Sequence, residues 1–497
     1  MNFTKALLIL FTVSFLTTSC FEDGDDNVIT ASSINDFVWK GMNLFYLYKD
    51  DVPDLANDRF SSDAEYGDYL NSFSSPEDLF ESLIYERETV DRFSWIVDDY
   101  IALEQLFAGT TSSNGMEFTL FRQPNSADKL IGIIRLVLPN SSASSGGLKR
   151  GDIFNAVNGT ELTITNYSGL LGTNSYSINL ASYNDKGTTE TTDDTIDPLN
   201  QSINLTKVEY TENPIFQSKV LTVGSEKVGY IMYNGFTANF DTQLNNAFGT
   251  FKSNNVQHLV VDLRYNPGGS VNSAILLASM ITGQFNGDIF STEEWNSDLQ
   301  SVFENEDPEL LINRFTNNDD NTPLNSLNLQ KVYIIALESS ASASELVINS
   351  LDPYINVVHI GENTAGKYQA STTLYDSPDF GREGANPSHS YAMQPLIFKS
   401  LNKVGRTDYP GGLTPDILVS ESYLNLGIIG DENEKLLAVA LAEIQNPTIK
   451  PINTKAEKEI ALKSFWDSNS FEPFLNDMHV DKKLPTDLLN RMILEQN

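Results

Sequence analysis

The sequence predicts a multidomain α/β protein. The evidence is that consecutive stretches of the chain have different hydrophobic patterns. Residues 31–112 place apolar side chains at three- and four-residue spacing, which is typical of amphipathic helices. Residues 113–212 contain short β-rich runs separated by serine, asparagine and glycine turns. Residues 220–430 alternate buried-strand patterns with helical stretches, which predicts an α/β domain. Residues 431–497 have the charged faces expected of a helical tail.

Individual elements follow from local signals within these stretches. In the first, Ser75 precedes Pro76 and two acidic residues, a pattern typical of a helix start. In the second, residues 130–138 form an apolar strand-like run, and the polar residues 188–197 are expected to form a surface loop. In the third, the predicted elements are strands at 228–236, 258–263, 332–337 and 357–360 and helices at 274–282 and 344–350.

Composition and charge exclude several classes of protein. The chain of 497 residues carries 32 basic and 67 acidic residues, a net charge of −35 that repels the phosphate backbone of nucleic acids. The single cysteine excludes an intramolecular disulfide and a paired-cysteine metal site. The four histidines are scattered, so we expect no histidine-rich metal centre and no cofactor.

The N-terminus has the pattern of an exported protein. Lys5 precedes an apolar run at residues 6–16, which has the length of a signal peptide and is too short to span a bilayer comfortably. The only cysteine, Cys20, follows, and the segment resembles a bacterial lipobox, in which the cysteine is lipidated and becomes the first mature residue. We therefore expect a lipoprotein signal peptide at residues 1–20 and an acidic tether at residues 21–30.

This interpretation places the protein in the cell envelope as an outer-membrane lipoprotein, facing either the periplasm or the outside. The acidic tether resembles the tag that directs some Gram-negative lipoproteins to the cell surface. An ordinary secretory signal with an incidental cysteine is the alternative. The position of the chain's one cysteine at the signal boundary favours a lipid anchor in the membrane.

Three segments place reactive or anion-binding groups at the ends of predicted strands. Residues 340–345 (SASASE) follow a strand and open a helix, so a serine hydroxyl lies beside helix N–H groups that can stabilise an anion. Residues 361–367 (GENTAGK) form a glycine-bracketed turn that ends in a lysine. Residues 262–269 (DLRYNPGG) run into a double-glycine turn, which lets a substrate approach the backbone closely.

Together, these segments resemble the motifs of peptidase family S41, the C-terminal processing (tail-specific) serine peptidases, and they occur in the family's order. Residues 147–159 (GLKRGDIFNAVNG) are similar to a segment of PDZ domains, and residues 411–417 (GGLTPDI) resemble a further family strand. The resemblance implies a ClpP/crotonase-like catalytic domain of ββα units, a PDZ-like β domain and a helical N-terminal domain.

The resemblance also implies roles for particular residues. Ser342 would be the nucleophile and Lys367 the general base of a Ser–Lys dyad that hydrolyses peptide bonds in unfolded or C-terminal segments of proteins. The N–H of Ala343 and that of Gly268 or Gly269 would form the oxyanion hole. A serine is a weak nucleophile until a base takes its proton, and an amine can take it only when neutral. The mechanism therefore needs a site shielded from water, in spite of the acidic net charge.

One departure from the family pattern concerns the lysine. Family members commonly carry a glutamine four residues after the lysine, and this glutamine orients the lysine. Here that position is Ser371, and Gln369 lies closer to Lys367. Either Gln369 or Ser371 takes this role, or the lysine is positioned otherwise.

A second departure concerns the PDZ-like domain. Gly115, Met116, Glu117 and Phe118 stand where PDZ domains have a glycine-rich loop that binds a peptide carboxylate. Glu117 replaces a glycine, and we expect its charge to disfavour an anionic C-terminus nearby. Whether this loop binds a terminal carboxylate stays open, as does the oligomeric state.

Other functions are compatible with parts of the sequence. A histidine-based triad could use His359 or His389, but the first lies in a predicted strand, the second in a turn-rich segment, and no GxSxG motif accompanies them. An inactive surface lipoprotein that binds peptides through its PDZ-like domain is a further alternative, and the presence of both dyad residues argues against it. We interpret Glu345 as a helix-capping residue and Asp262 as a structural hydrogen-bonding residue.

Overall fold

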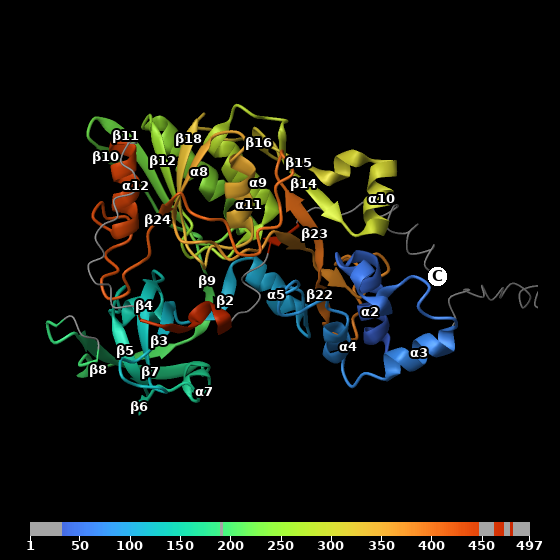
Figure 1. The fold of residues 1–497 in the computed structure, drawn as a ribbon, viewed down its shortest axis with the longest axis horizontal. Helices are drawn as coiled ribbons and strands as arrows, with labels where there is room; N and C mark the ends of the chain where they lie inside the picture. The colour runs from blue at the N-terminus through green and yellow to red at the C-terminus, as the bar shows by residue number, and fades with distance from the viewer. Residues whose placement is uncertain (1–31, 189–191, 447–461, 472–477, 481–497) are drawn as a thin grey trace, which may run out of the picture.

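The computed structural model describes residues 32–188, 192–446, 462–471 and 478–480 (Figure 1). The expected signal peptide, lipidation site Cys20 and acidic tether lie outside these ranges. Within them, no helix combines the length and the apolar character that crossing a bilayer requires.

A six-stranded sheet lies at the centre of the protein, with the order β10-β11-β12-β18-β19-β24. β10 and β11 are antiparallel, and the remaining neighbours are parallel. The strands are β10 (Ile215–Val223), β11 (Glu226–Tyr233), β12 (His258–Asp262), β18 (Lys331–Ala336), β19 (Asn356–Gly361) and β24 (Ile417–Leu418). Because β12, β18 and β19 run in parallel, the three motif segments that follow them emerge at the same edge of the sheet.

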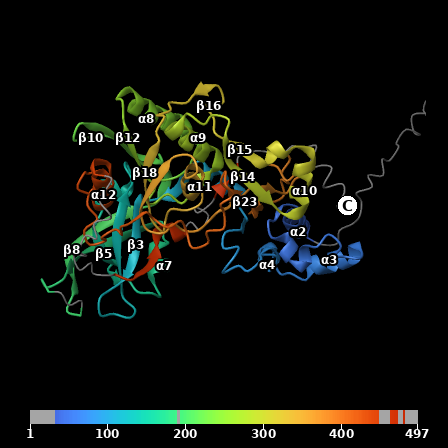
Figure 2. The same ribbon diagram turned by 45° about the horizontal axis from the view of Figure 1, so that its top comes forward.

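Helices cover both faces of this sheet (Figures 1 and 2). On one face, apolar side chains pack against α8 (Asp241–Ser253), α9 (Val271–Thr282) and α11 (Ala343–Leu351). On the other face, α12 (Lys435–Gln445) buries its leucine-rich stripe. The strands predicted around residues 228–236, 258–263, 332–337 and 357–360 are confirmed as β11, β12, β18 and β19, and the two predicted helices are confirmed as α9 and α11.

The N-terminal region is helical and packs on a small three-stranded sheet. Its helices are α2 (Ser33–Phe45), α3 (Asp63–Asn71), α4 (Pro76–Ser82) and α5 (Tyr100–Phe107), with 3-10 turns η1 (Lys49–Asp51) and η2 (Pro53–Leu55). The helix start predicted at Ser75 is confirmed, because its side chain accepts the Asp78 N–H at 3.1 Å. A sheet of β1 (Trp95–Val97), β22 (Ala392–Gln394) and β21 (Leu374–Tyr375) joins this region to the rest.

A second six-stranded sheet continues from the glycine turn toward the N-terminal helices, in the order β13-β26-β20-β23-β14-β15. Its strands are β13 (Gly269–Ser270), β26 (Met478–His479), β20 (Gln369–Ser371), β23 (Leu396–Leu401), β14 (Ile289–Trp295) and β15 (Ile312–Arg314). The region around β14 also contains α10 (Ser297–Glu306), η4 (Pro308–Leu311) and the pair β16 (Asn318–Asp319) and β17 (Thr322–Pro323). A further 3-10 turn, η3 (Ala238–Phe240), precedes α8.

A separate β-rich domain packs beneath the central sheet (Figure 1). Its sheet has the order β25-β3-β4-β5-β7-β8, with β6 paired to β5. The elements are β3 (Met116–Arg122), β4 (Leu130–Val137), α6 (Ser142–Ser145), β5 (Ile153–Val157), β6 (Thr160–Glu161), α7 (Tyr167–Leu171), β7 (Ser175–Asn184) and β8 (Thr195–Thr206). β2 (Thr110–Ser113) and β9 (Val208–Thr211) pair where the chain enters and leaves this domain.

Among its described residues, the C-terminal region matches the expected helical tail only at α12. Beyond α12, its described residues form β25 (Ser464–Asp467), the 3-10 turn η5 (Ser468–Phe471) and β26. β25 pairs with the edge of β3, and β26 lies between β13 and β20. The neighbouring strands offer backbone hydrogen-bonding partners to these residues. Pairing with those strands, and not the local helix propensity, therefore decides their conformation. The loop predicted at residues 188–197 lies between β7 and β8, as expected, except that β8 already begins at Thr195.

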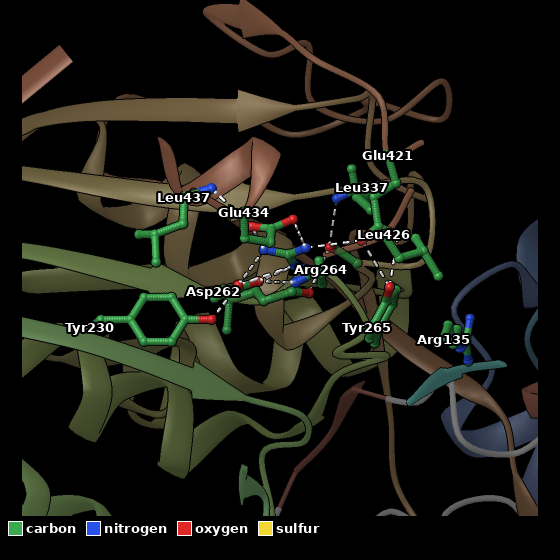
Figure 3. A network of polar contacts seen from close by, with 12 residues as sticks. Arg135, Tyr230, Asp262, Arg264, Tyr265, Leu337, Glu421, Leu426, Glu434 and Leu437 are labelled. Carbon is green, nitrogen blue, oxygen red and sulfur yellow. Dashed lines mark hydrogen bonds and ion pairs between the residues drawn. The ribbon is translucent and has the colours of Figure 1, made fainter. Parts of the chain in front are cut away.

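A buried ion network links the β-rich domain to the central sheet (Figure 3). Arg264 is fully buried and donates to Asp262 at 2.8 Å, to Glu434 at 2.8 and 2.9 Å and to Glu421 at 2.9 Å. Burial alone would lower the pKa of Arg264, but these carboxylates outweigh it and raise that pKa well above its ordinary value. Arg150 of the β-rich domain reaches the same Glu421 at 2.5 Å. The predicted structural role of Asp262 is therefore confirmed.

The network predicts a large loss of stability when its central cation is removed. Arg264→Met leaves three buried carboxylates short of a counter-charge, and we expect the free energy of unfolding to fall by about 3–5 kcal/mol. Arg406→Met is the matched control, because its ion pair with Asp352 is exposed and should contribute less than about 1 kcal/mol. Urea unfolding followed by tryptophan fluorescence measures both, and equal midpoints for the two variants would contradict the prediction.

Candidate active site

Ser342 lies at the turn between β18 and α11, in a conformation that L-residues rarely adopt. Its backbone angles are φ 64° and ψ −115°, and its side chain is buried. Its Oγ has no hydrogen-bond partner among the described residues. Strained, unpartnered side chains of this kind cluster at functional sites.

Neighbouring hydrogen bonds hold this strained turn in place. Ser340 Oγ donates to the Leu263 carbonyl at 2.7 Å, and the Ala341 N–H donates to the Asn266 carbonyl at 3.1 Å. Ser344 Oγ donates to the same Asn266 carbonyl at 3.0 Å. The serine turn is therefore fixed on both sides to the segment that contains the double glycine.

Glu345 connects the serine turn to the lysine turn. Its Oε2 accepts the backbone N–H of Ser342 at 2.8 Å and that of Lys367 at 2.9 Å. Its Oε1 accepts the Gly366 N–H at 2.8 Å and the Thr364 hydroxyl at 2.5 Å. The backbone nitrogens of Ser342 and Lys367 are therefore close together, because both donate to the same carboxylate oxygen.

The Glu345 carboxyl is buried at the N-terminus of α11. Burial raises its pKa, and the hydrogen bonds from the serine and lysine turns act in the opposite direction. The predicted capping role is confirmed, because the side chain accepts the Ser342 N–H. Its contact with the lysine turn was missed, since sequence spacing gives no indication of which turn lies opposite a helix start.

Lys367 is 1 % exposed and precedes β20. Its Nζ lies 5.0 Å from the centre of the Phe93 ring. Arg92 donates to the carbonyls of Ala365 and Gly366 at 3.4 and 3.5 Å. The N-terminal region therefore covers the lysine turn, which the sequence motifs did not predict.

The two residues considered for orienting the lysine both lie on β20 and are buried. The Gln369 amide donates to the Tyr48 hydroxyl at 2.8 Å, and its Oε1 has no partner among the described residues. Ser371 Oγ donates to the Met478 carbonyl at 3.4 Å. Gln369 therefore connects β20 to the N-terminal region, and Ser371 connects it to β26.

The double-glycine turn contains two of the predicted oxyanion donors. The Gly268 N–H donates to Asn266 Oδ1 at 2.9 Å, so this predicted donor is already engaged. Gly269 has φ 129°, and a Cβ there would lie 2.3 Å from the Phe236 carbonyl oxygen, so only glycine fits. Ala343 is the first residue of α11, where N–H groups have no acceptor inside the helix. The backbone of Gly269 in turn pairs with Met478 of β26, so the predicted donors stay Ala343 and one of the two glycines.

The C-terminal residues Met478 and His479 lie against this turn. β26 pairs in parallel with Gly269 and Ser270 and also meets Ser371 of β20. A cavity of about 210 Å³ lies next to it, between the β-rich domain and the central sheet. Its lining includes Gly268, Gly269, Phe118, Ser468 and His479.

The predicted peptide-binding loop of the β-rich domain is also occupied. Gly115 has φ 80°, and a Cβ there would lie 2.1 Å from Ser141 Cβ. Met116 and Phe118 belong to the core, and the Phe118 N–H donates to Ser468 Oγ at 3.0 Å. The C-terminal segment thus lies where we expected a peptide.

Glu117 lies beside an arginine from the adjacent strand, and whether a terminal carboxylate binds near it stays a prediction. Burial raises the pKa of Glu117, and the neighbouring Arg135, 3.4 Å away, lowers it. Arg135 also binds the carboxylate of Asp467. An acidic group is therefore accommodated beside Glu117, because an arginine from the adjacent strand lies between the two carboxylates.

Both histidines of the alternative triad have structural contacts. His359 lies within β19, where its Nε2 is 3.3 Å from the Ala336 carbonyl, and burial lowers its pKa. His389 Nε2 lies 2.9 Å from Asp376. Within the described residues, no group of three His, Cys, Asp or Glu side chains is arranged to hold a metal ion.

Comparison with known proteins identifies the domains. Residues 227–419 match the model of a peptidase domain, described as Peptidase family S41, and this range contains all three motif segments. Residues 33–95 match the model of the Peptidase S41 N-terminal domain. Over these two ranges, the chain is similar to the catalytic and N-terminal domains of peptidase family S41.

Several relatives are described as proteases. The chain is 25% identical over 242 residues to a carboxyl-terminal-processing protease of Picosynechococcus, covering 48% of this chain and 50% of that protein. It is 25% identical over 292 residues to a Staphylococcus epidermidis protein described as a CtpA-like serine protease, covering 53% and 54%. The chain thus spans about half the length of these curated relatives.

A solved structure supports the fold. A Bacteroides fragilis protein described as an S41 protease superposes with a TM-score of 0.64 at 24% identity, covering 83% of this chain and 98% of that one. The S41 protease fold with mixed α/β content is therefore confirmed.

The Glu345 contacts predict that its loss disturbs the whole site. Glu345→Ala leaves buried N–H groups of both turns without an acceptor, and we expect a loss of about 2–5 kcal/mol in unfolding free energy. Glu304→Ala on α10 is the control, because that side chain is exposed, accepts a hydrogen bond from Gln300 and should change stability by about 0.5 kcal/mol or less. Thermal unfolding compares them, and an unchanged midpoint for Glu345→Ala would contradict this prediction.

Proposed function

We propose that this protein is a serine endopeptidase that uses a Ser342–Lys367 dyad to hydrolyse peptide bonds in unfolded or C-terminal segments of proteins outside the cytoplasm. The observation that carries this proposal is the shared Glu345 carboxylate, which holds both residues in one buried site. The unpartnered Ser342 Oγ supports it, because a nucleophile must be free to attack.

The reaction takes place in two steps. The neutral Lys367 amine takes the Ser342 Oγ proton as that oxygen attacks the peptide carbonyl, and the resulting oxyanion accepts N–H bonds from Ala343 and from Gly268 or Gly269. The ammonium then gives its proton to the departing amine, which leaves an acyl-enzyme. Water then attacks the ester, and the lysine takes a proton from that water. As the carboxylic acid leaves, the lysine ammonium gives this proton to Ser342 Oγ, which restores the free enzyme.

Burial of the dyad fits this chemistry. Ser342 and Lys367 are both buried, so the reacting groups are shielded from bulk water.

The other regions have supporting roles in this proposal. The β-rich domain is a PDZ-like module that presents polypeptide substrates, and its helix α7 and strand β3 form the peptide-binding groove. Cys20 is the lipid attachment point that fixes the protein to the outer membrane. Three properties support this part of the proposal: the GLKRGDIFNAVNG segment, the order of the strands and the position of the sole cysteine.

The alternative of an inactive peptide-binding lipoprotein is less well supported. Both dyad residues are present, and the matched relatives are described as proteases. A peptide-binding role for the β-rich domain is compatible with either function.

The proposal predicts that both dyad residues are essential. Ser342→Ala and Lys367→Ala should each reduce cleavage of an unfolded protein by about 10⁴-fold or more, because the two residues act as one unit. Ser350→Ala is the matched control, since Ser350 is also buried on α11 with an unpartnered hydroxyl and should retain activity. Gel-based cleavage of denatured casein by purified residues 21–497 measures this. Equal cleavage by all proteins would indicate a contaminating protease and refute the proposal.

A lysine base also predicts the pH dependence. Cleavage should increase from pH 6 to pH 9, because the fraction of neutral amine increases with pH. The initial rate, measured with a fluorogenic peptide at constant ionic strength, tests this. A flat profile over that range would argue against a lysine base.

A further inference from the structure

The C-terminal segment occupies the edge of the β-rich domain as an added strand. β25 is antiparallel to β3, with Ser464 opposite Phe121, Trp466 opposite Leu120 and Asp467 opposite Thr119. Addition of an extended segment to a sheet edge is a common mode of peptide recognition, in which main-chain bonds supply affinity and side-chain pockets supply specificity. The edge of β3 is therefore a binding site whose occupant is visible.

Aromatic side chains mark the pockets that this occupant uses. Phe465 and Trp466 each lie with ring centres 5.4 Å from Tyr167, at the start of α7. Trp466 also lies 6.2 Å from Phe118 on β3. The Arg122 guanidinium lies 5.2 Å from the centre of the Phe465 ring. The groove between β3 and α7 thus accepts two consecutive aromatic residues.

A buried cation recognises the acidic residue that follows. Asp467 accepts a hydrogen bond from Thr119 Oγ1 at 3.0 Å and one from Arg135 Nη1. Arg135 is fully buried, and its other carboxylate partner is Glu117. Removing a carboxylate partner from a buried guanidinium is costly, so this position selects an acidic residue.

The same C-terminal stretch also reaches the candidate active site. Ser468 binds the Phe118 N–H and lines the cavity whose wall includes Gly269. Further along, Met478 and His479 pair with the Gly269 strand and with Ser371, and the His479 ring stacks 4.3 Å from Phe107. A polypeptide that entered along this path would have to replace these residues.

We propose that residues 464–468 are an internal ligand that competes with substrates for the β3–α7 groove, and that the groove selects extended polypeptides with two aromatic residues followed by an acidic one. The consequence for cleavage rests on the proposed peptidase function, whereas the binding competition does not. Release of this segment opens the groove and the path to the glycine turn.

Binding is tested in the full chain carrying Ser342→Ala, so that catalysis has no influence. The probe is a fluorescein-labelled peptide, KSFWDSN, which copies residues 463–469. We expect Asp467→Asn to strengthen its binding at least about tenfold over the Ser342→Ala parent, as measured by fluorescence polarisation. Adding Trp466→Ala should strengthen it further.

Matched controls separate competition from general loosening of the structure. Thr160→Ala should bind as the parent does, because Thr160 lies on β6 of the same domain with an exposed side chain. The probe with asparagine in place of its aspartate should bind every protein more weakly. If the double variant fails to fold, the near-isosteric Asp467→Asn alone decides. Equal binding of KSFWDSN to parent and Asp467→Asn, or equal binding of the two probes, overturns the proposal.

The catalytically intact chain separates the two proposals. Asp467→Asn should increase kcat/KM for an unfolded protein severalfold. Stronger peptide binding without cleavage by any chain would refute the peptidase function and leave the internal ligand supported. Cleavage by the wild type with unchanged peptide binding would refute the internal ligand alone.

Discussion

The position of the candidate site depends on how one buried guanidinium is neutralised. Arg264 lies directly after β12, and its three carboxylate partners come from β12, from the segment after β24 and from the start of α12. Burying these ions is expensive unless every hydrogen bond is made, so the elements can be arranged in few other ways. The first glycine of the double-glycine turn, Gly268, lies four residues beyond this arginine.

The network also extends toward the peptide groove. Tyr265 donates to Glu421 at 2.7 Å, and its ring lies 4.8 Å from the Arg135 guanidinium. Arg135 in turn binds Asp467 of the C-terminal segment. A continuous chain of polar and cation–π contacts therefore connects the occupied groove to the end of β12, and the charge at position 467 is balanced by the same buried groups that position the β-rich domain.

Much of the central domain could be predicted from sequence because its signals are local. Buried parallel strands read as apolar runs, and a helix start after a strand is visible in the SASASE segment. The capping role of Glu345 followed from its place in the first helical turn. That carboxylate's second partner, the lysine turn, depends on how β18 and β19 lie side by side, which no local pattern encodes.

The errors concerned segments whose conformation depends on distant partners. β25 and β26 are too short for a periodic signal and form only because β3, β13 and β20 offer backbone groups. Arg135 reaches Glu117 from the neighbouring strand, a contact that no local sequence pattern indicates. The contacts of Phe93 and Tyr48 with residues 367 and 369 likewise link regions far apart in the chain.

The short strand β25 also covers a sheet edge at which a second molecule could pair. β3 is the strand that would lie at the edge of its sheet if residues 464–467 were withdrawn, and an unpaired edge is a template for another chain. The best-fitting strand for that edge is the same segment of a second molecule, with identical register and side chains. Withdrawal at high protein concentration therefore favours reciprocal domain swapping, in which two molecules exchange C-terminal segments and each again has a closed sheet.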